Sequence, residues 1–213
     1  MPQSKPIKRK GPGGRPTQKE SARRKEKLLD IAQDEFLRQG YTETSVDRIA
    51  KRSGVSKATI YSHFTNKENL FEVISLRSVK DLRPAWRAIP QEGRDPADVL
   101  YDFARVIYAG TSLPDSLDTL RLAIAEAKQF PNISRAIWER RYETMAPLAE
   151  YMERLIKQNL IREDKPDAFA VSFINLVNNH TDLLIDGPIE DKSDLEEHLQ
   201  RAVAIFLGGV SVD

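Results

Sequence analysis

Apolar residues recur at helical spacing along most of this chain, and this periodicity restricts the folds it can adopt. No segment shows a sustained two-residue alternation bounded by turn signals, so no sheet is expected. Residues whose side-chain oxygen can cap a helix stand before several of the periodic stretches. The predicted caps are Ser45, Ser56, Asn66, Asp95, Asn132 and Ser193, the last with Glu196 in a capping box. The sequence therefore predicts an all-α fold.

We expect about nine helices. Their predicted spans are 19–40, 46–52, 57–64, 67–83, 96–109, 115–129, 133–159, 166–185 and 194–207. Gly40 is placed to end the first helix in the left-handed conformation. Pro84 should end or kink the fourth helix, and Pro147 should do the same in the seventh, because proline lacks the N–H that an inner turn needs.

Charge is distributed unevenly between the two parts of the chain. Residues 1–66 hold 15 Lys and Arg against 7 Asp and Glu, whereas residues 67–213 hold 18 against 25. A net charge of +8 followed by −7 suggests that the first part meets a polyanion, although a solvated basic tail is the alternative reading. We expect a flexible basic arm (1–18), a small helical domain (19–66) and a larger helical domain (67–213).

Several functional classes are not expected from this composition. The longest apolar stretches, 169–177 and 202–207, fall far short of the roughly 20 residues of a membrane-spanning helix, and the basic start does not resemble a signal peptide. We therefore expect a cytoplasmic protein with no membrane partner. The chain has no cysteine, three scattered histidines, no phosphate-binding loop and no nucleophile elbow. An enzyme, a bound metal and a cofactor are accordingly not expected.

Between Ser45 and Phe64 the pattern is that of a helix-turn-helix, with Gly54 allowing the sharp turn. Six apolar positions can converge between its two short helices: Val46, Ile49, Ala50, Val55, Ile60 and Phe64. The outer positions carry donors for phosphates or base edges: Arg48, Lys51, Arg52, Lys57, Thr59, Tyr61, Ser62 and His63. The second helix is suited to the major groove of DNA, which admits one helix and is read from that helix's first turns.

Two runs in this segment carry a family resemblance. They read Thr42-x-Thr44-Ser45-Val46-x-x-Ile49-Ala50 and Gly54-Val55-Ser56-x-x-Thr59-Ile60-Tyr61-x-His63-Phe64-x-x-Lys67-Glu68-x-Leu70. Together they resemble the N-terminal domain of the tetracycline-repressor (TetR) family, over about residues 24–72. The resemblance implies a dimeric transcriptional repressor that binds a double-stranded, palindromic DNA operator. Its larger C-terminal domain would bind a small-molecule effector and then release the DNA.

The resemblance also assigns roles to residues by position. Ser45 would cap its helix toward a phosphate, Lys57, Ala58, Thr59 and Ser62 would face the major groove, and Tyr61, His63 and Lys67 would hold the DNA backbone. Lys67 gains from the first turn of its helix, where backbone N–H groups already favour an anion. With Arg48 and Arg15 added, the expected DNA-binding residues are Arg15, Ser45, Arg48, Lys57, Ala58, Thr59, Tyr61, Ser62, His63 and Lys67.

Arg15 belongs to the basic arm. Its surroundings, Gly13-Gly14-Arg15-Pro16, resemble the core of an AT-hook, in which an extended arginine enters the narrow minor groove of A·T-rich DNA. Non-specific attraction to phosphates is the alternative.

The resemblance weakens after about Val73, and pattern alone guides the interpretation of the larger domain. Residues 121–131 resemble a segment of one C-terminal subgroup of the family. The candidate effector-binding residues are Tyr108, Phe130, Trp138, Tyr142, Met145, Phe173, Asn175, Asn178 and Asn179. Among these, Asn178 and Asn179 lie in an apolar helix where buried amides need partners.

The last two predicted helices are apolar on more than one face, which favours a homodimer formed through them over a monomer core. This interpretation uses the apolar positions Phe169, Phe173, Leu176, Val177, Leu183 and Leu184. Dimerisation would also supply the second half-site that a single short recognition helix lacks. An architectural protein that coats DNA without sequence selection is the main alternative function.

Overall fold

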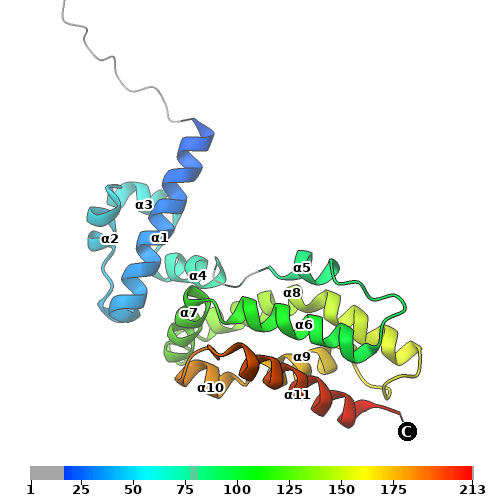
Figure 1. Cartoon of the computed structure of the whole chain (residues 1–213). Helices are drawn as coiled ribbons and strands as arrows, with labels where there is room; N and C mark the ends of the chain where they lie inside the picture. The colour runs from blue at the N-terminus through cyan, green and yellow to red at the C-terminus, as the bar shows by residue number, and fades with distance from the viewer. Residues whose placement is uncertain (1–16, 78, 80, 213) are drawn as a thin grey trace, which may run out of the picture. The chain divides into compact units, whose positions relative to one another are not determined.

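The computed structural model describes residues 17–77, 79 and 81–212, except for the side chains of residues 138 and 141. These residues form eleven helices, and outside them there is one isolated β-bridge, between Ile161 and Ser211. The prediction of an all-α fold is confirmed. The chain divides into two compact units between Thr65 and Asn66 (Figure 1). No helix in the described ranges combines the length and the apolar character needed to cross a membrane.

The described residues of the first unit form three helices, α1 (Gln18–Glu43), α2 (Val46–Ser53) and α3 (Lys57–His63). All three were expected from the sequence, but α1 extends three residues beyond its predicted end at residue 40. Thr17 and Glu20 form a capping box at the start of α1 that we did not predict: the Glu20 N–H donates to the Thr17 hydroxyl and the Thr17 N–H donates to the Glu20 carboxylate. The prediction that Gly40 ends the helix in the left-handed conformation was wrong. Gly40 lies inside α1 with a φ of 73° and a ψ of 173°, a conformation open essentially to glycine alone, and kinks the helix near its end.

Apolar side chains from all three helices form the core of the first unit. The buried residues are Leu28, Leu29, Ala32 and Phe36 of α1, Val46 and Ile49 of α2, and Ile60 and Phe64 from α3 and its end. Each of these side chains apart from Ala32 contributes about 1.5–3 kcal/mol through its burial. Four of the six positions predicted to converge in the helix-turn-helix are thus fully buried, and Ala50 and Val55 are half-buried.

A buried carboxylate adds a polar connection between α1 and α2. Glu35 is only 4% exposed, and its Oε1 accepts a hydrogen bond of 2.5 Å from Arg52. Arg52 also donates to Asp34 at 2.6 Å, and the Arg48 guanidinium lies 3.7 Å from the second oxygen of Glu35. Because Arg52 bridges two carboxylates on α1, it holds α2 in place as well as carrying charge.

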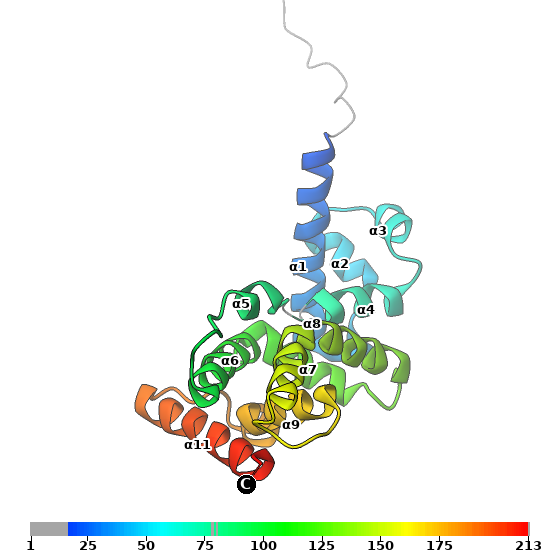
Figure 2. The ribbon, with the colours of Figure 1, turned by 90° about the vertical axis from the view of Figure 1, so that its right-hand side faces the viewer.

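The described residues of the second unit form eight helices. Figures 1 and 2 show their arrangement. They are α4 (Lys67–Arg77), α5 (Arg83–Arg87), α6 (Pro96–Thr111), α7 (Pro114–Ala125), α8 (Pro131–Lys157), α9 (Pro166–Asn178), α10 (His180–Ile185) and α11 (Lys192–Val210). Helix α9 packs against α6, α8 and α11. Between α9 and α11, the ring centroids of Phe173 and Phe206 lie 5.1 Å apart. The centre of this unit is therefore occupied by α9.

The sequence-based helix boundaries were wrong at two places in this unit, which explains eleven helices instead of about nine. The fourth helix ends at Arg77 and not near residue 83, and Pro84 lies in the first turn of α5, where proline's missing N–H costs nothing. The predicted helix 166–185 breaks at Asn179, whose φ of 39° and ψ of 62° are left-handed. Helix α8, in contrast, continues as one α-helix through Pro147.

Two predicted caps were also wrong. Helix α8 begins at Pro131, so Asn132 already lies inside it. At α11 the cap is Asp191, whose carboxylate accepts from the N–H groups of Ser193 and Asp194 at 2.7 and 3.1 Å. The predicted capping box of Ser193 with Glu196 therefore does not form.

Candidate nucleic-acid interface

Helix α3 is held by two local features that the sequence predicts. Gly54 ends α2 with a φ of 71° and donates its N–H to the Ala50 carbonyl at 3.0 Å. The Ser56 hydroxyl then caps α3 by accepting from the Thr59 N–H at 3.1 Å. Only Ile60 of α3 is buried. The rest of the helix is thus free to present its side chains to another molecule.

The candidate base-reading residues all lie on this exposed part of α3. Lys57, Ala58, Thr59, Tyr61, Ser62 and His63 are exposed, Tyr61 at 48%. Residues 58 and 62 are one turn apart, as are 57 and 61, so they form neighbouring rows along the helix. Ser45 is half-buried at the start of α2, and its hydroxyl already accepts from the Asp47 N–H at 3.2 Å.

Lys57 has an intramolecular partner that the sequence analysis missed. Its Nζ lies 2.7 Å from Asp47 Oδ1 and donates to Oδ2 at 2.9 Å, and this hydrogen bond raises the pKa of Lys57. Asp47 stands at the start of α2 and is exposed. A duplex that uses Lys57 must therefore take the ammonium group away from this carboxylate or accept both groups together.

The other polar groups of α3 are likewise ordered by local hydrogen bonds. The hydroxyls of Ser56 and Thr59 lie 2.8 Å apart, and the Ser62 hydroxyl donates to the Thr59 carbonyl at 2.8 Å. These contacts fix the side-chain orientations in advance. Preorganised donors lose less entropy on binding than freely rotating ones.

A basic groove lies beside α3 in the same unit, between the start of α1 and the turn before α3. Its lining includes Arg24, Lys25 and Lys27 of α1 together with Thr59 and His63 of α3, and none of the described residues that line it is acidic. These α1 residues were not among the predicted DNA contacts, although the run Arg23-Arg24-Lys25 with Lys27 at the start of a helix is a basic signal in the sequence. The groove is suited to a phosphate backbone.

Three of the predicted DNA-binding residues, Arg48, Lys67 and Arg15, do not lie on α3. Arg48 lies on α2 beside the buried Glu35, and half of its side chain remains exposed. Lys67 is the first residue of α4 and belongs to the second unit. Arg15 lies outside the described residues.

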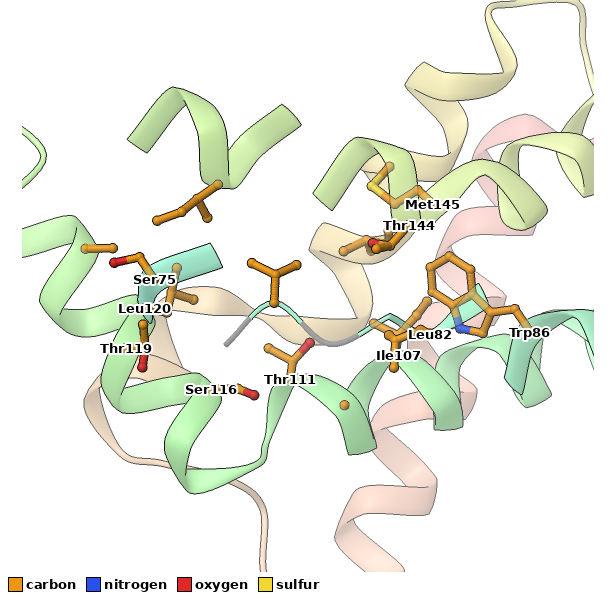
Figure 3. A pocket seen from close by; sticks show the side chains of 15 residues that line it. Ser75, Leu82, Trp86, Ile107, Thr111, Ser116, Thr119, Leu120, Thr144 and Met145 are labelled. Carbon is orange, nitrogen blue, oxygen red and sulfur yellow. The ribbon is translucent and has the colours of Figure 1, made fainter. Parts of the chain in front are cut away.

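The second unit contains an internal cavity between α4, α5, α6, α7, α8 and α9, with an empty volume of about 690 Å³ that is partly open to solvent. Fifteen of the described residues line it, most of them buried. Figure 3 shows their side chains. Its polar lining is Ser75, Thr111, Ser116, Thr119 and Thr144, together with the indole of Trp86. A concave space with a mainly apolar wall and a few polar groups is typical of small-molecule sites.

Of the nine candidate effector-binding residues, Met145 lines this cavity. Phe173 is a core residue against Phe206, and Phe130 packs edge-on against Phe71 at 6.1 Å. The Tyr108 hydroxyl accepts from the Ile189 N–H at 2.7 Å, and Tyr142 is 48% exposed.

The three asparagines take separate positions, and one candidate is not described. Asn175 lines a shallow surface groove with Ile124 and Leu184. Asn178 is 1% exposed and makes no hydrogen bond through its amide, and Asn179 forms the left-handed break after α9. The side chain of Trp138 is outside the described part of the chain.

Family models match both units. A model described as bacterial regulatory proteins of the tetR family matches residues 28–74. Another, described as the C-terminal domain of AefR-like transcriptional repressors, matches residues 98–209, more than half of the chain.

Relatives and solved structures agree over nearly the full length. An HTH-type transcriptional repressor from Mycobacterium tuberculosis is 28% identical over 188 residues, which cover 87% of this chain and 90% of the relative. A crystal structure from Mesorhizobium loti, described as a TetR-family transcriptional regulator, superposes with a TM-score of 0.75 at 28% identity, covering 90% of this chain and 98% of that one. The flavonoid-responsive regulator FrrA gives a TM-score of 0.72 at 26% identity, covering 89% and 98%.

Proposed function

This chain belongs to the TetR family of transcriptional regulators, and we propose that it acts as a dimeric repressor that a small molecule releases from a palindromic operator. The observation that carries this proposal is the combination of an exposed, preorganised α3 with a basic groove in one unit and an internal cavity in the other. The first two features suit a duplex, and the third suits an effector.

For DNA, we assign base reading to α3 and backbone contacts to its surroundings. Lys57, Thr59 and Ser62 carry the donors that would face the major groove, and Ala58 can meet a thymine methyl. Ser45, Arg48, Tyr61, His63 and Lys67 would contact phosphates, to which we add the groove residues Arg24, Lys25 and Lys27.

A pair of lysine variants tests this assignment. Lys57→Ala should reduce the preference for the operator over a shuffled duplex, because a base contact is lost. Lys51→Ala removes an exposed lysine from α2 of the same unit and should weaken both duplexes equally, if it has an effect. Equal loss on both duplexes for Lys57→Ala would contradict the base-reading role.

Asp47 offers an independent test of the same site. Asp47→Asn removes the carboxylate that holds Lys57 and that would repel phosphates. We expect tighter binding to every duplex, a steeper salt dependence and a smaller ratio of specific to non-specific affinity, measured by fluorescence anisotropy at several salt concentrations. An unchanged ratio would show that Asp47 has no part in discrimination.

For dimerisation, we keep the interface on α9 and α11 but base it on other residues of these helices. Phe169, Phe173 and Val177 all point into the core of their own unit, so they do not provide a second apolar face. The exposed positions of the two helices include small residues, Ala168 and Ser172 on α9 and Ala204 and Gly208 on α11, with Ile205 beside the latter two. Small residues allow two helix pairs to approach closely, and Ile205 is 56% exposed.

The oligomeric state tests this surface. Ile205→Lys should shift the protein from dimer to monomer in sedimentation velocity and weaken operator binding, because each monomer reads one half-site. Leu113→Lys is a matched control, since Leu113 is a comparably exposed apolar residue (42%) on the connection before α7. If Ile205→Lys remains a dimer, the dimer interface does not include the surface around Ile205.

For release, we assign the effector to the cavity. Ser75 on α4 lines it, and α4 follows α3 after only three connecting residues. A ligand that favours one position of α4 would therefore shift the population of states whose α3 helices match the operator spacing. The description of FrrA as flavonoid-responsive supports small-molecule control of a fold of this kind.

The basic arm keeps its two alternatives, minor-groove insertion of Arg15 and phosphate attraction. Deleting residues 1–18 and measuring affinity on A·T-rich and G·C-rich flanks separates them. An equal loss on both flanks excludes groove reading.

A further inference from the structure

The cavity of the second unit is lined mainly by apolar residues. Among the described residues that line it there is no Asp, Glu, Lys, Arg or His. Most of its wall is aliphatic, from Val79, Leu82, Ile107, Leu120 and other apolar side chains. A ligand that carried a formal charge into this space would lose its hydration and find no opposite charge in this lining, which is strongly unfavourable.

Two of the lining residues, Ser75 and Trp86, carry a buried polar atom with no hydrogen-bond partner among the described residues. The Ser75 Oγ and the Trp86 Nε1 are both inaccessible, and each residue is only 1% exposed. Buried polar groups in folded proteins are nearly always hydrogen-bonded, so two such groups in one cavity need an explanation. An indole N–H can only donate, whereas a serine hydroxyl can donate or accept.

The two groups lie at opposite ends of the cavity. Figure 3 shows Ser75 beside Leu120 and Thr119 at one end, and Trp86 at the other end next to Leu82 and Ile107. The space between them is bounded by apolar side chains, with the hydroxyl of Thr111 along one side. Both atoms are covered by neighbouring side chains, so a molecule that satisfied both would displace these side chains and would be elongated, with polar atoms near its ends.

We propose that the cavity binds an uncharged, elongated and mainly apolar molecule with a hydrogen-bond acceptor, such as a ketone oxygen, that meets the Trp86 Nε1–H, and a second polar group that meets the Ser75 hydroxyl. This inference rests on the proposed function, in that it defines the chemical class of the effector. It excludes carboxylates, phosphate esters and quaternary amines as ligands of this cavity.

Three fluorescent naphthalenes with one common skeleton test the proposal in the full-length protein. The probe 6-propionyl-2-dimethylaminonaphthalene carries a ketone, 6-dimethylamino-2-naphthoate carries a carboxylate in its place, and 2-dimethylaminonaphthalene has neither. We expect the ketone to bind about three- to tenfold more tightly than the compound without an acceptor. The carboxylate should bind at least about a hundredfold more weakly than the ketone. Equal or tighter binding of the carboxylate would overturn the proposal.

Variants of the two buried groups locate the contact. In Trp86→Phe the donor is lost, so the ketone and the compound without an acceptor should bind alike. A purely structural role of Trp86, which packs against Phe103 at 6.0 Å, would instead lower both affinities by the same factor. If Trp86→Phe does not fold, the emission of the ketone in the wild-type protein decides, since a hydrogen-bonded carbonyl emits at longer wavelength than one in an apolar solvent. Emission at the apolar position would refute the contact.

Ser75→Ala is a second variant, with Ser112→Ala as its matched control. Both serines carry an inaccessible Oγ without a partner, but only Ser75 lines the cavity. The probe is replaced here by its 2-(hydroxyethyl)methylamino analogue, which adds a hydroxyl at the end opposite the ketone. Ser75→Ala should weaken this analogue about three- to tenfold and Ser112→Ala should not. Equal effects of the two variants would contradict the role of Ser75.

The outcome for the ligand class can be separated from the outcome for the proposed function. Binding of the ketone with the expected selectivity, but no release of a selected operator, would keep the ligand class and refute effector control by this cavity. Operator binding without any selective uptake of the neutral probe would refute the ligand class and leave the DNA-binding function intact.

Discussion

Gly54 is the residue on which the orientation of α3 depends, and its replacement by alanine has a calculable cost. Its φ is 71°, and a Cβ built at this position would meet nothing within 4 Å. The substitution therefore involves no clash, only the strain of a left-handed L-residue, which is about 1–2 kcal/mol. We expect Gly54→Ala to lower the free energy of opening of residues 46–63 by about 1 kcal/mol, equivalent to about a fivefold higher open population.

Hydrogen exchange followed by mass spectrometry measures this opening directly. Amides of α2 and α3 should exchange about fivefold faster in Gly54→Ala, and less so in Gly54→Asn, because asparagine tolerates the left-handed region better. Operator affinity should fall by no more than a similar factor, since the folded geometry is retained. In Gly54→Pro, by contrast, the required φ is unattainable and operator binding should be lost.

Gly93→Ala is the control for this experiment. Gly93 has a φ of 67° and equally free space around its Cβ position, but it lies in the second unit. It should incur a similar local cost while leaving exchange in residues 46–63 and operator affinity unchanged. No change in Gly54→Ala, or a loss of several kcal/mol, would refute the conformation assigned to the turn.

Three further predictions concern stability. Glu35→Ala should destabilise the first unit by about 2 kcal/mol in urea, because the buried carboxylate no longer accepts from Arg52, and a change below about 0.5 kcal/mol would make that bond unimportant. Asn178→Leu keeps the branching of the side chain and replaces a buried amide that makes no hydrogen bond to the described residues. The substitution should raise the free energy of unfolding of the second unit by about 1 kcal/mol in urea melts followed by tryptophan fluorescence. A lower free energy of unfolding would mean that the amide is hydrogen-bonded. Burial raises the pKa of Tyr151 from 10.0 to about 12, so the contribution of Tyr151 to the free energy of unfolding is fully present below pH 10 and is lost as the pH rises through 12. Urea melts between these pH values should show this loss of stability in the wild type and not in Tyr151→Phe. Identical pH profiles of the two proteins would contradict the shifted pKa.

The helix-turn-helix could be predicted from the sequence because its determinants are local. Ser45, Gly54 and Ser56 act on residues at most four positions away, and the apolar spacing of short helices records their buried face directly. The pair of Lys57 with Asp47 joins residues ten positions apart in consecutive helices, and finding it required the turn geometry.

The cavity could not be predicted in the same way. Its lining comes from Ser75 to Ile174, over six helices, and which side chains face the interior depends on how those helices pack. Aromatic residues at helical spacing, such as Phe173, proved to be core, while the hydroxyl and indole groups that line the space have no distinctive spacing in the sequence. At Asn179 the helical pattern continued through a residue that adopts a left-handed conformation, so periodicity did not reveal the break.

Selection of bound duplexes from a random pool, followed by titration of the enriched and shuffled sequences, tests the central claim that α3 reads DNA. At about 150 mM salt the enriched duplex should bind at least about a thousandfold more tightly than the shuffled one. The ratio should fall toward one in a Lys57→Ala and Thr59→Ala double variant. No enrichment, with a ratio near one and the salt dependence retained, would instead identify an architectural protein that coats DNA and would contradict the account.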